Sequence, residues 1–107
     1  MSLDVYLYEV SEHGVFDYNI THNLNGMASL AGLYEALWRP EEIGVKTARE
    51  LVPILTDGLA LLKADPEQFK GLNPTNGWGD YDGLVRFVEN YLAACVKHPS
   101  ARVEVSR

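Results

Sequence analysis

The chain has 107 residues, a length that fits one domain built around a single core. Apolar residues make up 47% and charged residues 22%, which is ordinary globular usage and excludes a disordered chain or a long coiled coil. With 15 acidic and 9 basic side chains the net charge is -6, and no two Lys or Arg residues adjoin. Because nucleic-acid-binding proteins neutralise phosphates with clustered cations, no nucleic acid partner is expected.

Cys95 is the only cysteine, so the sequence offers neither an intrachain disulfide nor a thiolate cluster for a metal. Residues 1–4 lack the basic start of a secretion signal, and no stretch reaches the ~20 apolar residues needed to cross a bilayer. We therefore expect a cytoplasmic protein that has no membrane contact, no metal site and no cofactor.

A strand is predicted at each end of the chain. Leu3 to Val10 is rich in the β-branched and aromatic residues that favour strands. Arg102 to Ser106 alternates polar and apolar residues and follows Pro99, which ends any preceding helix. Because a lone strand leaves its backbone groups unpaired, the two segments are predicted to pair in one small sheet.

Residues 18–34 contain no Asp, Glu, Lys or Arg, in a chain that otherwise scatters charge freely. This mixture of asparagines, small residues and large apolar groups predicts a helix that protein surrounds on most sides. Thr21 or Asn19 would cap the helix, which would run to Trp38 and form the centre of the fold. Its broad apolar side would carry Leu24, Met27, Leu30, Ala31, Tyr34, Leu37 and Trp38.

Two further long helices are predicted. Thr47 would cap the first, in which Pro53 should introduce a bend or mark a later start. Asp65, followed by a proline, would cap a short turn, and Asp80 would cap the last helix. The expected fold is therefore α+β and mostly helical, with three main helices and paired terminal strands in one domain, residues 1–107.

His22 is the first candidate for chemistry. In the first turn of the predicted helix it would feel the positive end of the helix dipole and stay neutral, which suits a general base or a metal ligand. Gly26 and Ser29 would leave a notch beside its ring. The structural alternative is a histidine that hydrogen-bonds a backbone carbonyl in the core. Neither His-x₃-His nor His-Glu-x-x-His spacing occurs, so a metal site is not expected.

Trp78 is the second candidate, because it stands between two glycines, just after Asn76, where the backbone can bend and a partner can approach. Indoles dominate binding hot spots, although a tryptophan folded over the core is an equally good interpretation. Trp38 and Arg39 are the third candidate, since the guanidinium of Arg39 could hold a carboxylate or stack on a ring. The next acidic residues, Glu41 and Glu42, are typical of the first turn of a helix.

No nucleophile elbow, phosphate loop or dinucleotide-binding turn occurs. The leading hypothesis is a non-enzymatic binding or assembly domain whose partner is a protein, with itself as the expected partner in a homo-oligomer. The alternative is a small hydrolase or lyase in which His22 is the general base, with Glu35 or Asp80 nearby. A regulatory adaptor for another protein is a third hypothesis. The predicted binding residues are His22, Asn23, Trp38, Arg39, Asn76 and Trp78.

Three runs resemble parts of small proteins that are encoded by bacteria and their phages: NITHNL at residues 19–24, LWRPEE at 37–42 and NGWG at 76–79. The likeness covers most of the chain. The resemblance implies no activity, because none is assigned to such proteins, and it carries over no catalytic residue.

Overall fold

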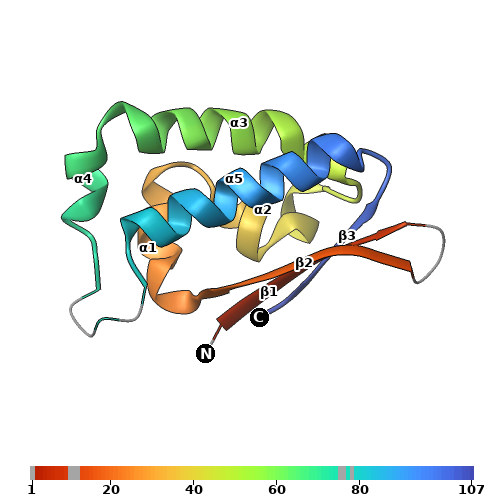
Figure 1. Ribbon diagram of the computed structural model, residues 1–107, viewed down its shortest axis with the longest axis horizontal. Coiled ribbons are helices and arrows are strands. Elements are labelled where there is room, and N and C mark those ends of the chain that lie inside the picture. Colours follow the sequence, from red (N-terminus) through yellow and green to blue (C-terminus); the bar gives the residue numbers. More distant parts are fainter. Residues whose placement is uncertain (1, 10–12, 75–76, 78) are drawn as a thin grey trace.

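The computed structural model describes residues 2–9, 13–74, 77 and 79–107. Figure 1 shows the helices on one side of a small sheet, with no described helix on the other side. The predicted α+β, mostly helical class is therefore confirmed. The elements in chain order are β1 (Ser2–Glu9), β2 (His13–Thr21), the 3-10 turn η1 (His22–Leu24), α1 (Asn25–Leu30), α2 (Tyr34–Trp38), the 3-10 turn η2 (Pro40–Ile43), α3 (Ala48–Ala64), α4 (Pro66–Lys70), α5 (Tyr81–Lys97) and β3 (Arg102–Ser106).

The sheet is antiparallel and has the strand order β2-β1-β3. Val5 of β1 lies opposite Val105 of β3 and Tyr18 of β2, so the predicted pairing of the terminal strands is confirmed. Alternate side chains of β1, those of Leu3, Val5 and Leu7, are fully buried beneath the helices. The residues between them face the open side of the sheet, as the two-residue period of a strand requires.

The continuous helix predicted from Thr21 to Trp38 is wrong. Residues 18–21 belong to β2, and the rest of the segment forms η1, α1 and α2. Gly32 has φ 75°, a left-handed conformation that ends α1, and Leu30 at its end is 48% exposed. Thr21 does cap the first turn, because its side chain accepts a hydrogen bond from the amide of Asn23. A run without charge also occurs in a strand that packs one face against a helix, so the pattern alone does not separate a strand from a sheltered helix.

The two long helices begin where the sequence predicted. Thr47 starts α3 in a capping box, in which Glu50 Oε1 accepts the Thr47 amide hydrogen at 3.0 Å. Pro53 therefore lies inside α3 and does not mark a later start. Asp80 starts α5, and its Oδ1 accepts from the amide of Gly83 at 2.7 Å. These local contacts fix where each helix enters the core.

A glycine lets α3 approach the break between α1 and α2. Gly58 of α3 faces Leu33, the fully buried residue that precedes α2. A Cβ atom at position 58 would lie 2.2 Å from Leu33 Cδ2, so only glycine leaves room for this side chain. This contact joins the segment that contains α1 and α2 to α3.

Aromatic rings join β2 to α5. Tyr18 meets Phe87 edge to face with ring centroids 5.3 Å apart, and Phe16 stacks on Tyr91 at 5.8 Å. Tyr91 is fully buried, and this burial raises the pKa of its hydroxyl. The inner face of β2 is therefore held firmly against a helix, which fixes the position of its outer edge.

Candidate functional site

Two of the predicted site residues, His22 and Trp38, do lie together. Their ring centroids are 6.2 Å apart with an interplanar angle of 65°, and Tyr34 stacks on the indole at 5.8 Å. Trp38 is only 2% exposed, so the prediction that it offers its ring to a partner is wrong. The physical reason is the large apolar area of an indole, which this short helix turns into the core.

His22 does not have the surroundings of a general base. Its Nε2 atom is buried and, among the described residues, has no hydrogen-bond partner. Glu35 is exposed, and Asp80 uses Oδ1 to cap α5. Within the described part of the chain neither carboxylate forms a hydrogen bond or an ion pair with His22. The described contacts therefore bring no acid, base or nucleophile together around this imidazole.

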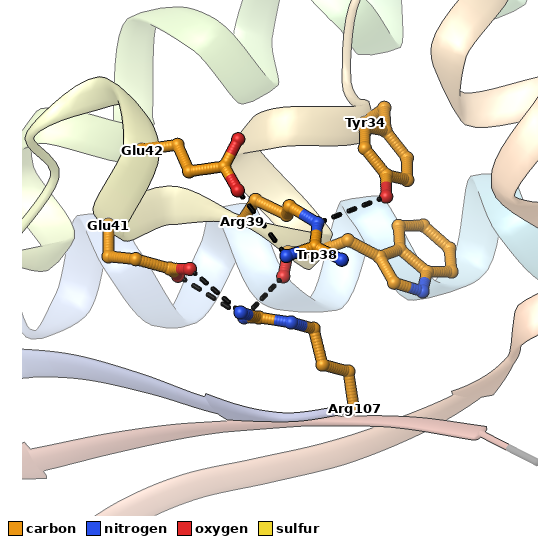
Figure 2. Close-up of polar contacts among 6 residues, drawn as sticks. All are labelled: Tyr34, Trp38, Arg39, Glu41, Glu42 and Arg107. Atoms are coloured by element: carbon orange, nitrogen blue, oxygen red, sulfur yellow. Dashed lines mark hydrogen bonds and ion pairs between the residues drawn. The ribbon is translucent and has the colours of Figure 1, made fainter.

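Arg39 is already engaged within its own segment. Its Nε donates to the hydroxyl of Tyr34 at 3.3 Å, and its Nη1 lies 3.3 Å from Glu42 Oε2 (Figure 2). The hydrogen bond with Tyr34 raises the pKa of Arg39. These contacts hold the turn between α2 and η2, which gives Arg39 a structural role.

Arg107 ties the same turn to the sheet, as Figure 2 shows. Its Nη1 donates to the backbone carbonyl of Trp38 at 3.0 Å, and its Nη2 lies 3.0 Å from Glu41 Oε2. The pKa of Glu41 is lowered mainly by a hydrogen bond that its carboxylate accepts from its own backbone amide, and to a smaller extent by the hydrogen bond from Arg107. No local pattern predicts this contact, because Arg107 lies 69 positions after Trp38 in the chain.

No described contact brings the other predicted site residues to the rings of His22, Tyr34 and Trp38. Asn23 is exposed on η1, and its amide donates to the side chain of Thr21. Asn76 and Trp78 lie outside the described residues, so their roles in binding stay predictions.

The outer edge of β2 is a feature that the sequence does not predict. β2 pairs with β1 on one side, and on the other side no backbone group of the described residues hydrogen-bonds to it. The strand has 9 residues, and Asp17 is the only one with a formal charge. Natural edge strands are usually protected by lysine, proline or a covering element. The sequence of β2 contains neither lysine nor proline.

A cleft runs beside the last part of this edge, opposite the start of α5. We call it the β2 groove; it has a volume of about 240 Å³. Gly79 has φ 89°, and a Cβ atom there would lie 2.6 Å from Thr21 Cγ2. Arg86 forms no hydrogen bond or ion pair through its guanidinium with any described residue. The lining residues are Tyr18, Asn19, Ile20, Thr21, Leu24, Gly79, Gly83 and Arg86.

No family model, curated protein or solved structure matches this chain. Within residues 2–9, 13–74, 77 and 79–107, no group of three or more His, Cys, Asp or Glu side chains is placed to hold a metal ion. Searched over the same ranges, the helices include none with the length and hydropathy of a membrane span. The function proposed below therefore rests on the surfaces of the fold.

Proposed function

We propose that this chain is a non-enzymatic assembly domain that dimerises by pairing its β2 edge with the β2 edge of a second copy. One observation carries the proposal: a nine-residue edge strand lacks a backbone partner among the described residues and has a single formal charge. Two identical strands related by a two-fold axis pair antiparallel, so that each strand donates and accepts in the same pattern. Such pairing would join the two sheets into one.

The charge-free run supports this proposal. Residues 18–21 begin the run and also form the far half of the β2 edge. Lysine at an edge keeps strands of different molecules apart, so an edge without charge is suited to pairing. The register between β1 and β2 shifts between Leu7 and Tyr8, and this irregularity disturbs the other half of β2. Pairing is therefore expected to centre on residues 18–21.

The surroundings of the edge leave room for a second strand. The β2 groove borders residues 18–21, so a cleft lies beside this part of the strand, and Gly79 lies against Thr21 at the end of the strand. Each copy has a net charge of -6, and two such molecules repel each other at long range. Salt screens that repulsion, whereas backbone hydrogen bonds depend little on salt. The dimer should therefore become more stable as ionic strength rises.

The proposal keeps the cytoplasmic location expected from the sequence. A single buried free cysteine suits a compartment in which disulfides do not form.

Sedimentation velocity over a range of protein and salt concentrations tests the dimer. The variant Asn19→Lys places a cation on β2 of each copy, in place of an amide that donates to Ser2 and Asp4. Like charges across a strand pair should weaken association about fivefold. Gln68→Lys is the matched control, because it makes the same change of charge at an exposed position of α4. A chain that stays monomeric at the highest attainable concentration would refute the proposal. Equal weakening by both variants would show that β2 is not the interface.

A further inference from the structure

The open face of the sheet carries two neighbouring tyrosines of β1, Tyr6 and Tyr8, with ring centroids 6.0 Å apart. Tyr8 already holds a cation. The guanidinium carbon of Arg102 lies 5.1 Å from the centroid of the Tyr8 ring, and Arg102 Nη2 lies 3.1 Å from Glu104 Oε2. One contact on this face therefore combines an aromatic ring, a guanidinium and a carboxylate.

Tyr6, like Tyr8, has a carboxylate beside it, but no described guanidinium or ammonium group lies over its ring. Asp17 of β2 and Glu104 of β3 lie directly opposite Tyr6 on the two flanking strands, and Asp4 lies two residues before it on the same face. No Lys or Arg of the described chain lies over the Tyr6 ring. We call these four residues, Asp4, Tyr6, Asp17 and Glu104, the Tyr6 face.

The electrostatics of the Tyr6 face favour a positive ligand. Burial raises the pKa of the Tyr6 hydroxyl, and the charges of Asp4, Tyr8 and Asp17 raise it further. Asp4 accepts a hydrogen bond from the side chain of Asn19 at 2.7 Å, which fixes its carboxylate in position. Asp17 is exposed and has no ion-pair partner among the described residues. A negative charge is thus available next to a half-buried aromatic ring.

We infer that the Tyr6 face binds an arginine side chain of a basic partner protein, with the guanidinium stacked on Tyr6 and paired with Asp17. Arginine fits better than lysine, because its flat guanidinium stacks on a ring while its edges donate to carboxylates. Arg102 on Tyr8 shows that this sheet accepts such a contact. The net charge of -6 would also attract a basic protein at long range.

The main rival explanation is attraction by net charge alone, and a matched variant separates the two. Asp17→Asn removes one negative charge from the Tyr6 face. Asp57→Asn removes the same charge from an exposed position of α3, which lies away from the open sheet face (Figure 1). Tyr6→Leu removes the ring without changing the charge, and Tyr6→Phe keeps the ring.

Isothermal titration with a six-residue arginine peptide at physiological salt tests the inference, with a lysine peptide of equal length for comparison. We expect Tyr6→Leu and Asp17→Asn each to weaken binding about three- to tenfold, and Asp57→Asn less than about twofold. Tyr6→Phe should bind like the unchanged protein, and the lysine peptide should bind more weakly than the arginine peptide. Thermal unfolding of each variant confirms that it is folded.

Equal losses from Asp17→Asn and Asp57→Asn would overturn the inference, because net charge would then explain the binding. So would unchanged binding by a folded Tyr6→Leu variant. If Tyr6→Leu does not fold, the comparison of Asp17→Asn with Asp57→Asn decides the question by itself. Sedimentation of the same variants shows separately whether the β2 dimer forms. The dimer does not depend on the ring of Tyr6, so it can form even if the Tyr6 face does not bind arginine.

Discussion

Adding one methyl group at Gly58 tests how closely α3 packs against the break between α1 and α2. The new Cβ atom would lie 2.2 Å from Leu33 Cδ2 and 2.4 Å from Leu33 Cγ. Carbon atoms in contact are normally ~3.5–4.0 Å apart, so Leu33 or the helix has to move by more than ~1 Å. Leu33 is fully buried, so in a close-packed core its side chain can move only by displacing its neighbours.

Two opposing energies decide the sign of the effect. Alanine is favoured over glycine inside a helix by about 1 kcal/mol. Overpacking a core typically costs about 1–3 kcal/mol and sometimes more, and a distance of 2.2 Å between two carbon atoms cannot persist without a shift of one of them. We therefore expect Gly58→Ala to lower the free energy of unfolding by about 2 kcal/mol. Urea unfolding followed by far-ultraviolet circular dichroism measures it.

A double-mutant cycle identifies Leu33 as the cause. Leu33→Ala alone should cost about 2–5 kcal/mol, because it leaves a cavity. The double variant with Gly58→Ala should cost less than the sum of the two changes, by about 1–3 kcal/mol, since the added methyl group occupies part of that cavity. Gly26→Ala is the control: it lies in α1 with nothing within 4 Å of its Cβ position, and it should be stabilising. If Gly58→Ala stabilises the protein as Gly26→Ala does, or if the losses simply add, the packing described for α3 is incorrect.

Two further predictions concern titratable groups. Burial raises the pKa of the Cys95 thiol to about 12, so the native protein should not react with a thiol reagent at mildly alkaline pH, whereas the chain unfolded in guanidinium should react at once; rapid reaction in the native state would contradict the buried position. Hydrogen bonds from the amides of Lys46 and Thr47 lower the pKa of Glu50 from 4.5. Its contribution to stability is therefore present above about pH 4.5 and lost as the pH falls through the lowered value. Glu50→Gln should reduce stability at neutral pH, and thermal melts should show this difference shrinking in acid; a difference that is constant with pH would argue against the capping box.

Features that depend on local chemistry were predictable from the sequence. Thr47 and Asp80 cap their helices with contacts that reach only three residues along the chain, so their positions could be found from the pattern of residues. The strands at 3–10 and 102–106 could be paired because few other partners were available to them. The confirmed parts of the fold are those that residue type and position in the chain are sufficient to predict.

Features that depend on distant contacts were not predictable. Gly32 inside a helical pattern costs only about 1 kcal/mol, so the sequence did not show that the helix ends there. The inward direction of Trp38 depends on the packing of a short helix whose last carbonyl is bound by Arg107, far along the chain. Whether β2 has a free edge depends on the strand order, which no local pattern specifies. The sequence therefore does not predict the candidate surfaces, and it predicts a binding surface where the structure has a buried aromatic cluster.

The central position of β1 has a consequence for how the chain folds as it is synthesised. β2 follows β1 closely in sequence, so the two strands can form a hairpin soon after they leave the ribosome. β3 can pair with the other side of β1 only after residues 102–106 have been synthesised, and the residues of all the described helices precede them in the chain. Joining strands so distant in sequence carries a large loop-closure entropy and slows folding. Until that last step the β1 edge that β3 will cover has no partner strand, and an unpaired edge can pair with a strand of another molecule.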